Sequence, residues 1–284
     1  MDKVLVTGVA GQLGYDVVRV LQDRNIEAVG VDIADFDLTD KEAVLSYIKK
    51  ASPTCIVHCA AYTAVDKAED DQEKAYAVNV LGTRHIAGAA KETGAKLMYI
   101  STDYVFDGEK KEPYDADDPN NPLGVYGNSK YLGEGECRAQ VQKLFIVRLS
   151  WVFGKNGNNF VKTMLRLSET KDEISVVCDQ SGSPTYTPDA ARIICDMIAT
   201  EQYGIYHVSN EGFCTWHEFA SEIMRLADRS TRIKPITTAE YPTRTRRPKN
   251  SCFSKKELDA NGFKRLPHWK DALDRYLKDI GAHK

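Results

Sequence analysis

The first 14 residues, MDKVLVTGVAGQLG, decide how the rest of the chain is interpreted. A short apolar run at 4–6 predicts a buried strand, and a helix is expected from about Gln12. Between them the glycines Gly8, Gly11 and Gly14 stand at every third position. Glycine suits a tight turn and a close approach of the backbone to a ligand, and the amino end of a helix attracts an anion. The stretch therefore predicts a phosphate-binding turn, and a turn without a ligand is the plainer alternative.

Beyond this turn, β-branched apolar runs alternate with segments of helical period. Strands are expected at 28–31, 55–60 and 96–100, and helices at 40–50 and 70–93. Strands that are apolar on both faces indicate a parallel sheet covered by helices on both sides, and right-handed crossovers then give a doubly wound α/β fold of the Rossmann type. In that fold the glycine turn holds the pyrophosphate of a dinucleotide at the carboxyl edge of the sheet.

The pattern changes after residue 149, where a Gly/Asn tract at 154–159 begins a half that also carries a basic loop at 241–250. A single core stops growing at about 250 to 300 residues, so a large domain with a smaller one is expected. We place a dinucleotide-binding domain at 1–152 and a mainly substrate-binding domain at 153–284. The return of some segments of the second half to the first domain stays open at this stage.

Composition and charge exclude several classes of protein. Of the 284 residues, 42% are apolar and 28% charged, and 38 basic against 41 acidic side chains give a net charge of −3. A soluble globular protein is expected, with no basic field for nucleic acid and no apolar run near the ~18 residues that span a membrane. The seven scattered cysteines and the lack of a signal-peptide pattern predict a cytoplasmic protein with reduced thiols.

An acidic residue follows the second expected strand. Asp32 lies 24 positions after Gly8, where a carboxylate can accept from the adenine-ribose hydroxyl and repel a 2′-phosphate. This favours NADH, but Arg24 is expected close enough to offset the repulsion, so NADPH and NADH both stay candidate cofactors. The plainer interpretation of Asp32 is a solvated acid at the end of a strand.

A tyrosine and a lysine four positions apart, Tyr126 and Lys130, lie on one face of an expected helix. With 14 tyrosines in the chain, such a pair also arises by chance, so position matters more than spacing. The helix follows a strand that ends in Ser101-Thr102-Asp103, which brings these side chains to the carboxyl edge of the sheet. A nearby ammonium and a cationic nicotinamide ring favour phenolate, so Tyr126 is predicted to exchange a proton with a substrate. An ordinary pair on a helix surface is the alternative.

Further motifs occur along the chain, namely Cys59-Ala60-Ala61-Tyr62-Thr63-Ala64-Val65-Asp66, Ser101-Thr102-Asp103-Tyr104-Val105-Phe106, Trp151-Val152-Phe153-Gly154, Gly182-Ser183-Pro184-Thr185 and Arg247-Pro248-Lys249-Asn250-Ser251. With the glycine turn and the Tyr126–Lys130 pair, they make the chain resemble the extended short-chain dehydrogenase/reductases, and among these the dTDP-4-dehydrorhamnose reductases. The resemblance runs over nearly the whole chain. It implies an NAD(P)-dependent oxidoreductase that reduces the C4 keto group of dTDP-4-dehydro-L-rhamnose to give dTDP-L-rhamnose.

The resemblance also implies roles for single residues. The cofactor would lie along Gly8, Gly11, Gln12, Leu13, Gly14, Asp32, Asp37, Leu38, Ala61, Tyr62, Thr63, Tyr126 and Lys130. Tyr126 is implied to protonate the C4 keto oxygen, and Thr102 to hydrogen-bond the same oxygen. Lys130 is implied to hold the nicotinamide ribose and to lower the pKa of the tyrosine.

Asp103 and Trp151 are implied contacts of the sugar. An indole face suits the apolar side of a deoxysugar, and a core aromatic at the seam between the domains is the alternative. The loop Arg244-Thr245-Arg246-Arg247 can hold the substrate diphosphate through bidentate guanidinium contacts, and Arg247 is the residue we single out. Solvated charge on a loop is the plainer interpretation of these arginines.

One departure from the resemblance concerns a metal. Some members of the family are described as dimerising around magnesium held by acidic residues, one of them just after the glycine turn. This chain has Tyr15-Asp16 there, and no matching partners can be assigned near Thr187-Pro188-Asp189. We therefore predict no metal site, and a homodimer stays an open expectation.

Other functions stay open at the level of the sequence. A nucleotide-sugar dehydratase needs a base for the sugar C5 proton, normally a Glu after Thr-Asp, where this chain has Tyr104. An epimerase would keep the tyrosine and the lysine. A non-catalytic NADP-binding subunit, similar to the regulatory subunit of methionine adenosyltransferase, is the alternative from another class. The intact Thr102, Tyr126 and Lys130 favour catalysis.

Overall fold

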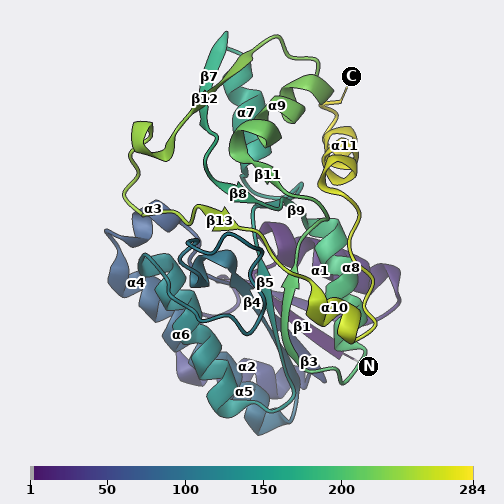
Figure 1. The fold of residues 1–284 in the computed structure, drawn as a ribbon. Helices are drawn as coiled ribbons and strands as arrows, with labels where there is room; N and C mark the ends of the chain where they lie inside the picture. The colour runs from purple at the N-terminus through teal and green to yellow at the C-terminus, as the bar shows by residue number, and fades with distance from the viewer. Residues whose placement is uncertain (1–2, 284) are drawn as a thin grey trace.

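The computed structural model describes residues 3–283. Its centre is a sheet of six parallel strands in the order β10-β5-β4-β3-β1-β2 (Figure 1). These strands are β1 (Lys3–Thr7), β2 (Glu27–Val31), β3 (Cys55–His58), β4 (Lys96–Thr102), β5 (Leu144–Leu149) and β10 (Gly204–Val208). The predicted doubly wound α/β fold is confirmed.

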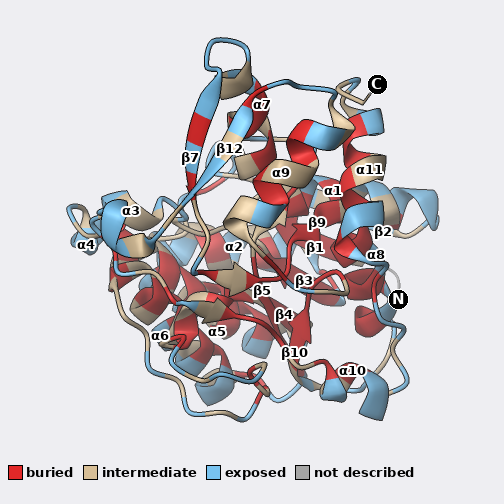
Figure 2. Cartoon of the chain, turned by 45° about the horizontal axis from the view of Figure 1, so that its top comes forward, coloured by how far each residue is buried: buried red, intermediate tan, exposed pale blue. Residues whose placement is uncertain are grey.

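Helices cover both faces of this sheet, because successive strand residues point to opposite sides. Val4 and Val6 pack with side chains of α1 and α8, whereas Leu5 between them packs with side chains of α2, α5 and α6. These helices are α1 (Gln12–Asp23), α2 (Lys41–Ala51), α5 (Thr83–Thr93), α6 (Val125–Gln140) and α8 (Thr187–Ile198). Figure 2 shows buried residues on the strands and on the inner sides of the helices.

The long helix expected at 70–93 is divided in the structure. Between β3 and α5 lie α3 (Val65–Ala68), α4 (Gln72–Tyr76) and a π-helical segment, η1 (Ala77–Gly82). A π-helical turn inserts an extra residue into a helix and often marks a functional site. Here it contains the buried Asn79, whose Oδ1 accepts from the N–H of Tyr62 in the loop after β3.

The second half forms a smaller layer above the carboxyl edge of the sheet (Figure 1). It contains α7 (Phe160–Ser168), β7 (Glu173–Val177), α9 (Trp216–Leu226), β12 (Arg232–Ile236) and α11 (Trp269–Asp279). Its shorter elements are β6 (Val152–Phe153), β8 (Ser181–Gly182), β9 (Thr185–Tyr186), β11 (Cys214–Thr215) and β13 (Asn250–Ser251). The helix α10 (Lys256–Ala260) instead packs beside β10 of the large sheet. Its own core gathers Phe153, Phe219 and Tyr276.

Segments that follow residue 153 also belong to the large sheet. Strand β10 pairs with β5, and α8 packs Ala190 and Ile194 into the core formed by α1 and the sheet. Leu258 and Leu266 reach the same core. The two halves of the chain are therefore interleaved.

The sheet order fixes where a ligand can lie. From β1 the chain crosses to β2 on one side, whereas β3 lies on the other side of β1. In doubly wound sheets this reversal opens a crevice at the carboxyl ends of the strands. The glycine turn follows β1, and Cys59 to Thr63 follow β3, so both segments border the crevice.

Within residues 3–283 no helix is long and apolar enough to cross a membrane. All seven cysteines are free thiols, and five of them are buried.

Candidate active site

A cavity of about 820 Å³ lies over the crevice between the sheet and the second half of the chain. Most of the residues that the sequence nominated for a site line it, namely Gly8, Gly11, Gln12, Leu13, Gly14, Asp32, Asp37, Leu38, Ala61, Tyr62, Thr63, Thr102, Asp103, Tyr126, Lys130, Trp151 and Arg247, whereas Arg24, Arg244 and Arg246 do not. The fold thus brings together residues that are spread over 240 positions of the sequence.

The glycine turn has no room for side chains. Gly8 has φ +73°, and a Cβ on it would lie 2.7 Å from the amide nitrogen of Ala60. A Cβ on Gly14 would lie 2.4 Å from the carbonyl oxygen of Gly8. Gly11 is the N-cap of α1 and carries no capping side chain, so the amino end of the helix faces the cavity. This geometry suits the binding of a phosphate group.

The Gly/Asn tract of the second half contacts this turn. Asn156 donates from Nδ2 to the carbonyl oxygen of Ala10 at 2.8 Å, and Asn159 donates to Oε1 of Gln12 at 3.0 Å. Gly157 and Asn158 line the cavity. From the sequence, this tract was predicted only as a domain boundary, although its glycine and asparagine content is typical of a loop that approaches a ligand.

The carboxylate of Asp32 lies at the end of β2 and is held by the backbone. It accepts from the N–H of Ala10 at 2.8 Å and from the N–H of Ile33 at 2.9 Å. The expectation that Arg24 lies beside it is wrong. Arg24 forms an ion pair with Asp196 of α8 at 2.8 Å and does not line the cavity.

Asn79 organises the loop after β3, and the sequence analysis did not find it. Its Oδ1 accepts from the N–H of Tyr62 at 2.8 Å, and its Nδ2 lies 3.1 Å from the carbonyl oxygen of Tyr62 and 2.9 Å from Oγ of Ser129. Ser129 in turn donates to the carbonyl oxygen of Tyr126 at 2.8 Å. One side chain thus links the loop of Ala61, Tyr62 and Thr63 to the helix that carries Tyr126.

Thr102, Tyr126 and Lys130 come from β4 and two successive turns of α6. The Thr102 hydroxyl donates to Oδ1 of Asp103 at 3.0 Å. The Tyr126 ring meets the Tyr104 ring edge-on, with centroids 5.5 Å apart. The Nζ of Lys130 lies 4.1 Å from the centroid of the Tyr99 ring.

Burial dominates the ionisation of these groups. It raises the pKa of Tyr126 to about 12, and the hydrogen bond with Thr102 opposes this only in part. The sequence led us to expect a lowered pKa, but desolvation of the phenolate dominates, and the charge of Asp103 raises the pKa further. Burial also lowers the pKa of Lys130 to about 8 and raises the pKa of Asp103 to about 6. In the protein alone, Tyr126 therefore keeps its proton near neutral pH.

Two tryptophans form an aromatic platform in the cavity. Trp151 has φ +47° and stacks on Trp216 of α9, with ring centroids 3.6 Å apart and planes 12° apart. A Cβ on Gly182 would lie 2.6 Å from the Trp151 indole, so glycine is required there. Trp151 both packs against the core of the second half and lines the cavity, as does Trp216, which the sequence analysis missed.

Of the arginines in the basic loop, only Arg247 lines the cavity. Its Nη2 donates to Oδ2 of Asp66 at 2.8 Å, and its buried Nε has no hydrogen-bond partner among the described residues. Arg244 pairs with Asp70, and Arg246 pairs with Glu109 at 2.9 Å outside the cavity. Of the loop that was expected to hold the substrate diphosphate, only Arg247 is therefore placed to contact a ligand in the cavity.

The acid after the glycine turn faces the protein interior. Asp16 is buried and accepts from the Thr187 hydroxyl at 2.6 Å, and burial raises its pKa. Asp189, two residues after Thr187, accepts two hydrogen bonds from Arg275. Residues 3–283 contain no group of three or more His, Cys, Asp and Glu side chains arranged to hold a metal ion.

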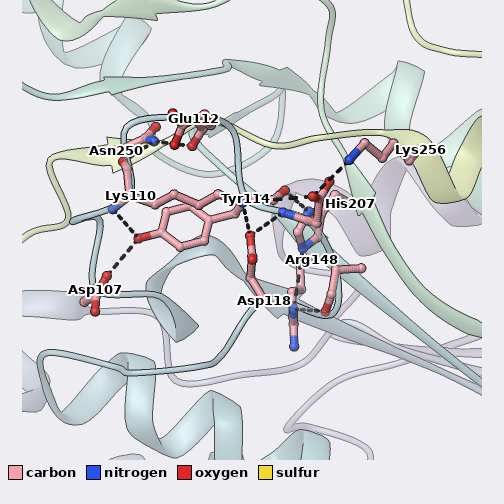
Figure 3. Close-up of polar contacts among 11 residues, drawn as sticks. Asp107, Lys110, Glu112, Tyr114, Asp118, Arg148, His207, Asn250 and Lys256 are labelled. Atoms are coloured by element: carbon pink, nitrogen blue, oxygen red, sulfur yellow. Dashed lines mark hydrogen bonds and ion pairs between the residues drawn. The ribbon is translucent and has the colours of Figure 1, made fainter.

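A buried ion pair anchors α6, the helix that carries Tyr126 and Lys130, to the face of the sheet on which it packs. Glu134, one turn after Lys130, accepts from Nε and Nη2 of Arg148 at 2.9 and 2.8 Å and from the Ser101 hydroxyl at 2.6 Å. Arg148 also donates to the carbonyl oxygen of Ala116 at 3.1 Å. Figure 3 shows Arg148 beside His207, below the loop that contains Tyr114.

Comparisons with known proteins agree with this geometry. A family model described as the RmlD substrate binding domain matches residues 2–281. The spore coat polysaccharide biosynthesis protein SpsK of Bacillus subtilis strain 168 is 42% identical, over 98% of each chain. The dTDP-4-dehydrorhamnose reductase of Aggregatibacter actinomycetemcomitans is 39% identical, over 100% of this chain and 99% of the relative.

A solved structure is also similar over its full length. The dTDP-4-dehydrorhamnose reductase of Bacillus anthracis strain Ames, in complex with NADP, is 44% identical and superposes with a TM-score of 0.96. The match covers 98% of this chain and 99% of that one. The chain belongs to the RmlD substrate binding domain family, among the extended short-chain dehydrogenase/reductases.

Proposed function

We propose that this protein is a dTDP-4-dehydrorhamnose reductase. It would use NADPH or NADH to reduce the C4 keto group of dTDP-4-dehydro-L-rhamnose and release dTDP-L-rhamnose. The observation that carries the proposal is that Thr102, Tyr126 and Lys130 line one cavity with the glycine turn. The full-length similarity to proteins named dTDP-4-dehydrorhamnose reductase supports this substrate.

The residues of the cavity fit a nicotinamide dinucleotide. Gly8 and Gly14 leave space that a Cβ would fill, and the uncapped amino end of α1 faces that space. Gly11, Gln12 and Leu13 would hold the pyrophosphate, and Asp32, Asp37 and Leu38 the adenosine. Ala61, Tyr62 and Thr63, with Tyr126 and Lys130, would border the nicotinamide riboside.

When bound, NADPH or NADH supplies the hydride for the reaction. Tyr126 donates its proton to the C4 keto oxygen, and its raised pKa keeps that proton in place until the substrate takes it. The Thr102 hydroxyl, next to the phenol, orients the same oxygen and stabilises the phenolate that is left. Lys130, buried but charged below a pKa of about 8, holds the ribose and adds a positive charge to the site.

The second half supplies the substrate contacts. Trp151, supported by Trp216, offers a flat apolar surface for the deoxysugar. Asp103 has one buried carboxylate oxygen without a partner among the described residues, which suits a sugar hydroxyl. The unpartnered Nε of Arg247 suits an oxygen of the diphosphate.

Two rival functions are disfavoured by single residues. A dehydratase needs a carboxylate after Asp103, and this chain has Tyr104, whose phenol is buried with its pKa raised above the ordinary value. A binding subunit without activity has no need for Thr102, Tyr126 and Lys130 in one cavity. Reduction of the keto sugar is the function that uses all three.

The direct experiment is an absorbance assay with purified protein, dTDP-4-dehydro-L-rhamnose and NADPH. Oxidation of NADPH that depends on the sugar nucleotide, with dTDP-L-rhamnose as product, is the expected result. The wild type and Tyr126→Phe are compared, because the variant keeps the fold and lacks the acid. NADPH binding without turnover would favour the binding subunit, and interconversion of sugars without net oxidation of NADPH would favour an epimerase.

We also propose that residues 1–152 are the cofactor domain and 153–284 the substrate domain, with α8 and β10 returned to the first. A cytoplasmic homodimer completes the proposal. Light scattering on the purified protein tests the dimer, which should have twice the mass of a 31.8 kDa chain.

A further inference from the structure

The catalytic helix α6 receives its cap from a residue far away in sequence. Its N-cap is Gly124, which has no side chain to bind the free N–H groups of the first turn. The N–H of Val125 instead donates to Oε1 of Glu69 at 2.9 Å. Glu69 ends α3 and precedes Val125 by 56 positions. The next residue of the helix is Tyr126, so Glu69 holds the turn that carries the acid.

Glu69 also contacts the basic loop of the second half. The connection between β12 and β13 passes α3 (Figure 1), and Thr245 of this connection is 1% exposed. The Thr245 hydroxyl lies 3.0 Å from the carbonyl oxygen of Val65 and 3.4 Å from Oε1 of Glu69. The same carboxylate oxygen thus faces the catalytic helix and the loop that carries Arg247.

The loop is joined to α3 by a second contact. Asp66 accepts from the N–H of Thr245 at 3.4 Å through Oδ1, and from Nη2 of Arg247 at 2.8 Å through Oδ2. Arg247 reaches from this loop into the cavity. A movement of Arg247 therefore displaces Asp66 and Thr245, and Thr245 lies against Glu69.

The groups around Glu69 are closely packed. A Cβ on Gly124 would lie 2.6 Å from Oε1 of Glu69 and 2.8 Å from Cγ2 of Thr245. Close-packed groups of this kind move together, because a gap or an overlap of a few tenths of an ångström is costly. Displacement of the loop is therefore transmitted to the first turn of α6.

We propose that Glu69 is a positioning residue, which couples the diphosphate-binding loop at Arg247 to the placement of Tyr126. The inference rests on the proposed function, because it takes Arg247 to bind the substrate diphosphate. Occupation of Arg247 fixes Thr245 against Glu69, and Glu69 then fixes the amino end of α6. The substrate thus helps to place the acid that protonates it.

The first test compares kinetic constants of Glu69→Ala and Glu69→Gln. Glu69→Ala is expected to lower kcat by roughly 10- to 100-fold, because small misplacement of a reacting group is costly. The KM for NADPH should stay within about 3-fold of the wild type, since the glycine turn is untouched. Glu69→Gln should restore kcat to within about 3-fold, because its amide oxygen still accepts from Val125 and Thr245.

Asp40→Ala is the matched control. The Asp40 carboxylate caps α2 through the N–H of Ala43 at 3.0 Å, on an exposed position that does not line the cavity. Its loss removes a carboxylate cap without touching α6, so kcat should be unchanged. All variants are assayed below their unfolding temperatures, determined by circular dichroism. Equal kcat values for Glu69→Ala and Asp40→Ala would overturn the proposal, as would a Glu69→Gln variant no better than Glu69→Ala.

The second test measures the coupling without turnover. Hydrogen–deuterium exchange is followed in peptides that cover residues 124–130, with and without dTDP-L-rhamnose. The ligand should slow exchange there in the wild type and in Asp40→Ala, but not in Glu69→Ala or in Thr245→Val. Equal protection in all four proteins contradicts the coupling. Calorimetry of the wild type keeps the two claims apart, because failure to bind dTDP-L-rhamnose would refute the proposed function, whereas binding without coupling would refute only the role of Glu69.

Discussion

Replacement of Glu134 by alanine, with Arg148 kept, perturbs the anchor of the catalytic helix. Glu134 and Arg148 have side chains that are 0% and 1% exposed, so neither charge can reach water after its partner is removed. Arg148 would keep its hydrogen bonds to Ala116 and to Asn120 but would lose both bonds to the carboxylate. The Ser101 hydroxyl would also lose its acceptor.

The size of the effect follows from this burial. Removal of one partner of a buried ion pair costs about 3 to 5 kcal/mol, because the remaining charge is left uncompensated. For a chain of this length, about 2 °C of Tm corresponds to each kcal/mol, so Tm should fall by about 6 to 10 °C. The double variant Glu134→Leu/Arg148→Met removes both charges of this pair and should lose less stability than Glu134→Ala alone.

Thermal unfolding followed by circular dichroism measures these differences. The matched control is Glu136→Ala on the same helix, where Glu136 forms a bidentate pair with Arg84 at 2.9 and 2.7 Å. Arg84 is 55% exposed, so that pair should contribute less than about 1 kcal/mol. The reasoning is refuted if Glu134→Ala and Glu136→Ala lose the same Tm, or if the double variant is less stable than Glu134→Ala.

Three further predictions concern the cavity. Both NADPH and NADH should support reduction, and Asp32→Ala should shift the ratio of their KM values toward NADPH; a wild type that rejects NADH outright contradicts the role given to Asp32. Arg247→Ala should weaken binding of dTDP-L-rhamnose by an amount that depends on salt, whereas the loss in Trp151→Ala should not, as calorimetry at two salt concentrations would show. Unaltered affinity in both variants places the substrate elsewhere. Finally, kcat/KM should fall as the pH rises above about 8, because Lys130 then loses the proton whose pKa burial has lowered to about 8; a profile that stays flat well above that pH contradicts the need for its charge.

Local patterns in the sequence were sufficient for the scaffold. The apolar run before Gly8 forms β1, and the helix expected from Gln12 begins there. The alternating strands and helices could be predicted without knowledge of distant contacts, because the spacing of apolar residues differs between a strand and a helix. The segment at 70–93 was only partly predicted, because the π-helical turn at Ala77–Gly82 depends on contacts that Asn79 makes elsewhere in the fold.

Pairings between distant residues could not be predicted in this way. Arg24 was expected at the cofactor, but its partner Asp196 lies 172 positions away on α8. Neither Trp216 nor Glu69 belongs to a local sequence motif. Trp216 stacks on Trp151 and Glu69 contacts Thr245, and each of these contacts joins the two halves of the chain. The pKa of Tyr126 rises because the fold buries it, and burial is a property of the folded chain rather than of the Tyr126–Lys130 spacing.

The central claim is that Tyr126 is the proton donor of the reduction, and Tyr126→Phe tests it most directly. The measurement pairs turnover of dTDP-4-dehydro-L-rhamnose with the Kd of NADPH for the wild type and the variant. A positioned acid contributes about 10² to 10⁴ in rate, so the variant should lose that factor in kcat while its Kd for NADPH stays within about 3-fold. Turnover close to that of the wild type, with NADPH bound equally well, would contradict the claim.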